Sequence, residues 1–138
     1  MNPIIREHFD FFETRLIESP AIVSYQILSR EIAVSDGKMR VKASLRDGGN
    51  VELFEYVAES KGIIRVVKYS FHWQNAQGKL RRRWDNAPHH PELSNAPHHV
   101  HIENDYVRQI AQVPDIFSVI RKIEDALQND SDTNPNLE

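Results

Sequence analysis

Residues 36–50 read DGKMRVKASLRDGGN, and their pattern predicts the class of fold. Apolar side chains at positions 39, 41, 43 and 45 alternate with polar or basic side chains at positions 40, 42, 44 and 46. A period of two is typical of a strand with one buried and one solvated face. The Asp-Gly pair at 36–37 and the segment 47–50 are turn signals at its two ends. The stretch therefore predicts a strand of an antiparallel sheet, and the basic face of this strand is expected to be exposed to solvent.

The same pattern continues in both directions along the chain. A β-prone run at 22–34 precedes the stretch, and runs at 51–58, 63–74 and 79–85 follow it, with turn signals between them. A sixth short strand is expected at 98–103, whereas 106–111 fits either a strand or a helix. Turn signals at this regular spacing predict a meander or a strongly curled sheet.

Two amphipathic helices flank the predicted sheet. Apolar residues recur at positions 5, 9, 12 and 16 of the first helix, residues 3–18, and at 116, 120, 123 and 127 of a second that starts at Pro114. We therefore expect a single α+β domain over residues 1–128, with a curled antiparallel sheet of five or six strands between an N-terminal and a C-terminal helix. The polar residues 129–138 are expected to form a disordered tail.

The composition narrows the class of protein. The 138 residues include no cysteine, which excludes disulfides and thiolate metal sites and suits a cytoplasmic location. No apolar run reaches membrane-spanning length, so we expect no membrane contact. The net charge of −3 conceals an asymmetry, because residues 1–102 carry 14 basic and 12 acidic side chains while residues 103–138 carry 3 and 8. A face of the body could therefore still bind an anion.

The chemistry is expected to lie in residues 84–101, where the pentapeptide NAPHH occurs twice and five of the seven histidines gather. Imidazole exchanges protons near neutral pH, a carboxylate can orient it, and guanidinium groups bind phosphate. The catalytic candidates are His89, His90, His98, His99, His101, Arg83 and Asp85. The candidates for substrate binding are Tyr69, His72, Arg81, Trp84 and Asn86. This combination predicts metal-free RNA cleavage, in which one histidine deprotonates the 2′-hydroxyl and another protonates the leaving 5′-oxygen.

Two other hypotheses remain open at this point. In a strand, His99 and His101 point to the same face and could chelate zinc or nickel with Asp85 or a loop histidine, whereas the first hypothesis needs no cofactor. Alternatively, the chain binds RNA or a protein without catalysis, through the basic side chains Arg40, Lys42, Arg46 and Arg81.

Some of these residues also have an ordinary structural interpretation. Trp84 could belong to the core, and Asn86 could be a turn residue that caps a strand end.

Three segments carry a resemblance to a known family: YSFHWQ at 69–74, RWDNAPHH at 83–90 and PHHVH at 97–101. They resemble the TumE family, the toxins of prokaryotic type II toxin–antitoxin modules. The resemblance implies a toxin that a cognate antitoxin protein neutralises, with RNA as the expected target. It singles out Arg83, Asp85, Asn86 and the five clustered histidines. Val100 departs from the pattern, which places a basic residue between the last two histidines. An exposed edge strand would also allow a homodimer.

Overall fold

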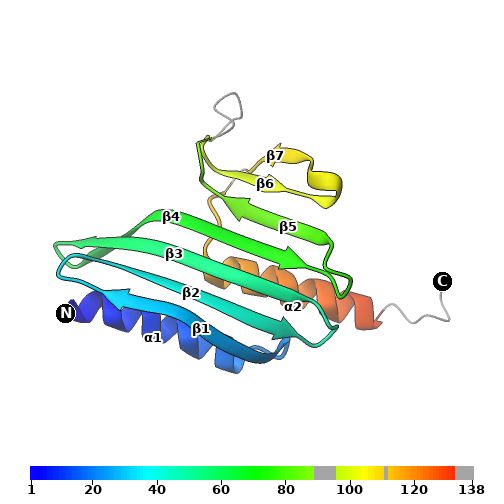
Figure 1. Cartoon of the computed structure of the whole chain (residues 1–138), viewed down its shortest axis with the longest axis horizontal. Coiled ribbons are helices and arrows are strands. Elements are labelled where there is room, and N and C mark those ends of the chain that lie inside the picture. The colour runs from blue at the N-terminus through cyan, green and yellow to red at the C-terminus, as the bar shows by residue number, and fades with distance from the viewer. Residues whose placement is uncertain (89–95, 111, 133–138) are drawn as a thin grey trace.

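The computed structural model describes residues 1–88, 96–110 and 112–132 of the chain. The helices are α1 (Pro3–Glu18), α2 (Ile116–Asp132) and a short 3₁₀ helix, η1 (Glu103–Asp105). The strands are β1 (Ile22–Ile32), β2 (Asp36–Leu45), β3 (Asn50–Ser60), β4 (Ile63–Gln74), β5 (Leu80–Asp85), β6 (His99–His101) and β7 (Val107–Gln109). In these ranges the strands form one antiparallel sheet in the order β1 to β7, as Figure 1 shows. The predicted α+β architecture is confirmed: a curled meander is preceded in the chain by one helix and followed by another.

The sheet has one strand more than expected. The ambiguous residues 107–109 pair with β6 as an additional strand, so that His101 lies opposite Val107 and His99 lies opposite Gln109. Three-residue strands contain too few positions for a period of two to be recognised in the sequence.

The second helix also differs at both ends from its prediction. It begins at Ile116 rather than at Pro114, and the carboxylate of Asp115 accepts a hydrogen bond of 2.8 Å from the backbone N–H of Ser118. This is the contact of an N-cap residue, which stands just outside the helix. The helix continues to Asp132, into the segment predicted as a tail, and residues 133–138 lie outside the described residues.

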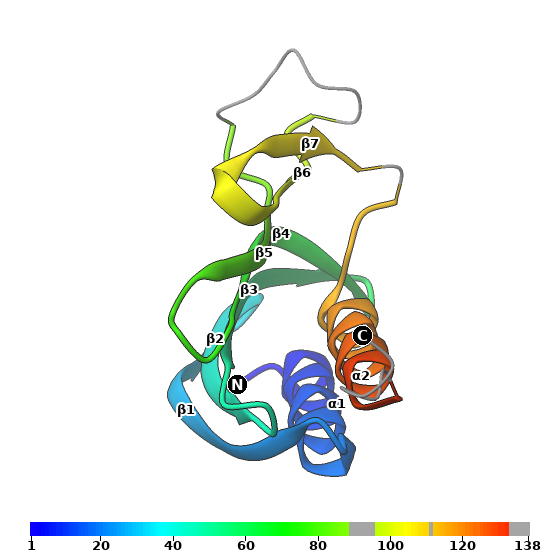
Figure 2. The same cartoon turned by 90° about the vertical axis from the view of Figure 1, so that its right-hand side faces the viewer.

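Both helices cover the same, concave face of the sheet (Figure 2). Their apolar stripes pack against the buried side chains that alternate along the strands, such as Met39 and Val41 of β2 and Phe71 of β4. The two helices are also joined directly, because Arg15 donates two hydrogen bonds of 2.8 and 2.7 Å to the Glu124 carboxylate. The core therefore lies between the helices and the concave face. No helix in the described ranges is long and apolar enough to cross a membrane.

The strand residues that alternate with the core residues form the opposite side of the sheet, which we call the open face. In β2 these are Lys38, Arg40 and Lys42, and both lysines are exposed, as the alternation predicted. The open face continues across β3 and β4 to the short strands β5 and β6, and β6 contains two histidines. The fold thus separates a helix-covered apolar face from a polar face that can meet a partner or substrate.

Candidate functional site

The strand register assembles the site on the open face from β4, β5 and β6. One cross-strand row consists of His72, Arg83 and His101, and the next consists of Ser70, Asp85 and His99. Side chains directly opposite each other on neighbouring antiparallel strands have Cβ atoms about 4.5–5.5 Å apart. Residues from three strands therefore share one small area, in which the β4–β5 hairpin places His72 opposite Arg83.

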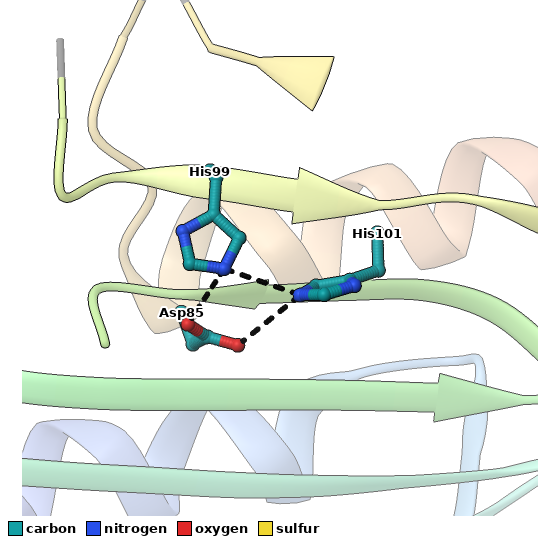
Figure 3. Close-up of side chains that lie close together, drawn as sticks. All are labelled: Asp85, His99 and His101. Carbon is teal, nitrogen blue, oxygen red and sulfur yellow. Dashed lines mark hydrogen bonds and ion pairs between the residues drawn. The ribbon is translucent and has the colours of Figure 1, made fainter. Parts of the chain in front are cut away.

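Asp85, His99 and His101 converge at the centre of this area (Figure 3). Nε2 of His99 lies 3.0 Å from Oδ1 of Asp85 and 3.1 Å from Nε2 of His101. Nε2 of His101 lies 3.8 Å from Oδ2 of Asp85. All three side chains are largely buried, with 9% of Asp85, 1% of His99 and 6% of His101 exposed. The structure thus brings together the three residues that the sequence suggested as metal ligands.

The hydrogen bonds of His99 determine what the cluster must contain. Its Nδ1 lies 2.7 Å from the carbonyl oxygen of Pro97, and because a carbonyl can only accept, Nδ1 carries the hydrogen. In a neutral ring, Nε2 would then present a lone pair to the Asp85 carboxylate and to His101 at hydrogen-bonding distance. Such a contact between acceptors needs a proton, on Nε2 or on the carboxyl group, or a metal ion between them.

Arg83 adds a permanent positive charge to the cluster. Its Nη2 donates a hydrogen bond of 3.0 Å to Nε2 of His101, and its Nε lies 3.4 Å from Oδ2 of Asp85. The Asp85 carboxylate also accepts a hydrogen bond of 3.0 Å from the backbone N–H of Ala87. The backbone hydrogen bond therefore holds the Asp85 carboxylate beside the two imidazoles, and the guanidinium stabilises the carboxylate by its charge.

A cavity of about 410 Å³ adjoins the cluster on the open face. Its lining includes Arg83, Asp85 and His72 of the two rows, together with Ser70 and three residues from β2, β3 and β4: Arg40, Phe54 and Lys68. A second cavity, of about 530 Å³, is lined by His72, Arg83, residues at the turn between β4 and β5, and the first two residues of η1. His72 and Arg83 thus line both cavities, which makes them the cluster's neighbours with the widest access to a ligand.

Tyr69 of β4 and His98, the residue before β6, lie on the opposite, core side of the sheet. The Tyr69 hydroxyl and Nδ1 of His98 are joined by a hydrogen bond of 2.9 Å. Burial raises the pKa of Tyr69 well above its ordinary value, and the charge of Asp85 raises it further. Burial also lowers the pKa of His98, and the neighbouring His99 lowers it too. His98 therefore does not share the face of His99 and His101, as the strand alternation predicted.

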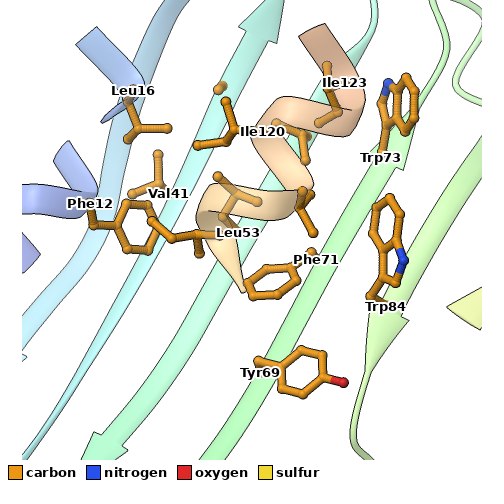
Figure 4. Close-up of a cluster of buried hydrophobic side chains, with 14 of the residues drawn as sticks. Phe12, Leu16, Val41, Leu53, Tyr69, Phe71, Trp73, Trp84, Ile120 and Ile123 are labelled. Carbon is orange, nitrogen blue, oxygen red and sulfur yellow. The ribbon is translucent and has the colours of Figure 1, made fainter. Parts of the chain in front are cut away.

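Three of the residues predicted to bind substrate make structural contacts. Trp84 is 5% exposed and lies in the core beside Trp73 and Phe71 (Figure 4), so its ring is not presented for stacking on the open face. Asn86 accepts a hydrogen bond from Tyr69 N–H and donates one to Val67 O, both 3.0 Å long. Its amide thereby fastens the end of β5 to the backbone of β4.

Arg81 is the third of these residues. Its guanidinium carbon lies 4.4 Å from the centre of the Trp73 ring, and its Nη1 lies 3.9 Å from Asp47. These contacts hold it against an aromatic residue of the core and a turn carboxylate, because β5 is irregularly paired where it meets the end of β4.

The comparison with protein families decides the identity of the chain. A family model described as toxin TumE matches residues 12–131. The chain belongs to the TumE toxin family. This match includes every strand that contributes to the Asp85 cluster and confirms the resemblance seen in the sequence. No curated protein and no solved structure matches the chain.

Within this TumE chain, the two loop histidines His89 and His90 lie outside the described residues. The sequence interpretation missed Lys68, Ser70 and Phe54 as cavity residues, and it considered Arg40 only for the binding hypothesis. Lys68, Ser70 and His72 alternate along β4, so the period of two was a signal for the first two. Nothing in the sequence indicated that Phe54 and Arg40 would join them, since that depends on the register of β2 and β3.

Proposed function

We propose that this TumE toxin acts on RNA as a metal-independent endoribonuclease, with its active site at the Asp85 cluster and the adjoining cavity. The observation that supports it best is the composition of this cavity. Three cationic side chains, Arg40, Lys68 and Arg83, line it together with His72 and the Asp85 carboxylate. Clustered cations attract the phosphodiester backbone, whereas imidazoles and carboxylates move protons.

The cations have separate tasks in this proposal. Arg83 is next to the proton-transfer groups, so it offsets the charge that grows on the phosphorus-bound oxygens in the transition state. Arg40 lies with its guanidinium carbon 4.4 Å from the Phe54 ring centre and pairs with Glu52 at 3.0 Å. It therefore forms, with Phe54, a platform at the far wall on which a base can stack.

The proton between His99 and Asp85, together with the position of His72, suggests which group acts as the acid and which as the base. His72 takes the proton from the 2′-hydroxyl, and that oxygen forms a bond to phosphorus while the bond from phosphorus to the 5′-oxygen breaks. The proton shared by His99 and Asp85 passes from Asp85 to the leaving 5′-oxygen. The products are a 2′,3′-cyclic phosphate and a free 5′-hydroxyl, and transfer of the proton from His72 through water restores the starting state.

The test is to incubate the purified protein with RNA in excess EDTA and to identify the chemistry of the new ends. We expect cleavage that yields 2′,3′-cyclic phosphates and that is lost in the Asp85→Asn variant. Cleavage only after a metal is restored would overturn the metal-independent mechanism and favour the metal-dependent hydrolase. Tight RNA or protein binding without cleavage under any condition would favour the binding module.

Membership of a toxin family also supports a cognate antitoxin as partner. A homodimer stays a prediction, for which the edge strands β1 and β7 are the available sites.

A further inference from the structure

We infer that Asp85, His99 and His101 form a binding site for a divalent transition-metal ion, zinc in particular, and that Arg83 competes with the metal for this site. The metal site goes beyond the proposed function, which needs no metal. Only its inhibitory consequence, given below, rests on the proposed function.

The positions of the three ligand atoms fit a tetrahedral ion. With metal–ligand bonds of about 2.0–2.2 Å, neighbouring ligand atoms of a tetrahedral zinc site lie roughly 3.3–3.6 Å apart. Nε2 of His99 lies 3.1 Å from Nε2 of His101 and 3.0 Å from Oδ1 of Asp85, while Nε2 of His101 lies 3.8 Å from the other carboxylate oxygen, Oδ2. One ligand atom from each of the three residues lies within 4.8 Å of the other two. Small rotations of these side chains are therefore enough to place one ion in contact with all three, and two imidazoles with a carboxylate are a donor set that suits zinc.

The groups behind the ligands support the same inference. A histidine that binds a metal through one nitrogen usually donates its other N–H to a carbonyl or carboxylate, which fixes the ring orientation. Nδ1 of His99 donates to Pro97 O in this way, which leaves Nε2 as the nitrogen that points at Asp85 and His101. The N–H of Ala87 likewise holds Oδ1 of Asp85. In both ligands a backbone group therefore fixes the side chain that faces the proposed ion.

Arg83 stands in the way of the ion. Its Nη2 uses the Nε2 lone pair of His101 that a metal would need, and its charge repels a divalent cation. The Arg83 side chain is 36% exposed and lines both cavities, so it has room to turn toward solvent when a metal binds. Zinc therefore replaces the positive charge at the centre of the cluster and displaces Arg83 from it.

This exchange has a consequence for activity if the proposed function holds. Zinc would replace the proton between Nε2 of His99 and Asp85, and it would move Arg83 away from the phosphate. Zinc is therefore expected to inhibit the RNA cleavage seen in EDTA.

The test is calorimetric titration of the chelator-treated full chain with zinc chloride in the absence of RNA, with the visible spectrum of the cobalt(II)-loaded protein as a second readout. We expect one zinc per chain and a cobalt spectrum of a four-coordinate site. Asp85→Asn and His101→Gln should weaken binding by roughly 100-fold or more, since even the outer partners of metal ligands contribute about 10- to 100-fold. Arg83→Met should strengthen binding at least about tenfold, because a like charge is removed.

His98→Gln is the matched control, because His98 is next to His99 but lies on the opposite face. It should bind zinc with the parent affinity. Circular dichroism establishes that each variant is folded, and the Arg83→Met variant keeps the test decisive even if a ligand variant does not fold. The inference is overturned if the parent binds no zinc, if Arg83→Met binds zinc more weakly than the parent, or if His98→Gln loses as much affinity as Asp85→Asn.

The two proposals fail in different ways. RNA cleavage in EDTA by a protein that binds no zinc would overturn only the metal site. One zinc bound by the parent, with cleavage only in its presence, would support the metal site and overturn the metal-independent mechanism.

Discussion

Two carboxylates, one on each face of the sheet, are buried beside a histidine. Glu55 of β3 is 1% exposed on the helix-covered face, and its Oε1 lies 2.9 Å from Nε2 of His8 of α1. Asp85 of β5 is 9% exposed on the open face, and its Oδ1 lies 3.0 Å from Nε2 of His99. The pairs are alike in their chemistry and in their distances.

Their surroundings differ. Glu55 lies between α1 and the sheet among apolar core residues, so its contact with His8 fastens a helix to a strand. Asp85 lies next to a second histidine and an arginine, and it lines a cavity that has two further cations. A contact between histidine and carboxylate therefore does not mark a functional site by itself. A site needs several such groups to converge where a ligand can enter.

The largest expected effect is on the open face. Arg83→Ala should lower the rate of RNA cleavage by about 10²–10³-fold, because one group that stabilises transition-state charge is typically worth this much. Arg82→Ala is the matched control, since Arg82 pairs with Glu103 at 3.1 Å, and it should cleave at the parent rate. Equal loss in the two variants, measured on folded protein, would argue against a specific role for Arg83.

On the helix-covered face, the same kind of change should affect stability instead. His8→Ala leaves the buried Glu55 carboxyl without this contact and should lower the free energy of unfolding by roughly 1–3 kcal/mol. Urea denaturation measures this free energy of unfolding. Glu7→Ala, a change at the exposed neighbouring residue, is the control. RNA cleavage per folded molecule should be unchanged. A loss of cleavage without a loss of stability would remove the distinction between the two faces.

The contact between the helices gives a smaller, pH-dependent effect. The hydrogen bonds from Arg15 hold the pKa of Glu124 below its ordinary value of 4.5. A carboxyl whose pKa is lowered by folding adds stability above its unfolded pKa, and that stability is lost as the pH falls. Arg15→Ala should therefore cost roughly 1–2 kcal/mol at neutral pH. The difference between parent and variant in urea denaturation should shrink below pH 4.5, and a difference that grows there would contradict this account.

The smallest effect concerns His98, on the core side of the site. Because burial lowers its pKa, the folded chain binds this proton more weakly than the unfolded chain does. Its contribution to stability is thus complete above the ordinary histidine value of 6.5 and declines as the pH falls. Titration of the ring followed by NMR should give a midpoint below 6.5, and a midpoint above it would be inconsistent with the buried position.

Local pattern was sufficient to predict much of this molecule. The alternation in residues 39–46 identified the wet and buried faces, and the spacing of apolar residues located α1 from Pro3 to Glu18. It also separated His98 from His99 and His101, because neighbours in a strand point to opposite faces. The doubled pentapeptide directed the site prediction to residues 84–101, and that location stays a prediction.

Register and long-range pairing could not be predicted in the same way. The alignment of separate strands determines which β6 histidine completes each cross-strand row and which residue lies opposite it. It also determines whether Arg40 and Phe54 line the same cavity. The sequence left Asn86 and Trp84 with two interpretations, because polar and aromatic side chains suit both a site and a structural contact. Only their partners, the β4 backbone and the core, distinguish the two roles.

In the proposed function Asp85 takes part in the reaction, whereas Glu55, the other buried carboxylate beside a histidine, does not. The most direct measurement compares growth arrest in cells that express Asp85→Asn or Glu55→Gln, matched for soluble protein. Each change replaces one buried carboxylate by its neutral amide, one on each face of the sheet. We predict that Asp85→Asn abolishes growth arrest while Glu55→Gln retains it. Growth arrest by Asp85→Asn equal to that of the parent, or its loss in both variants at equal soluble levels, would contradict the account.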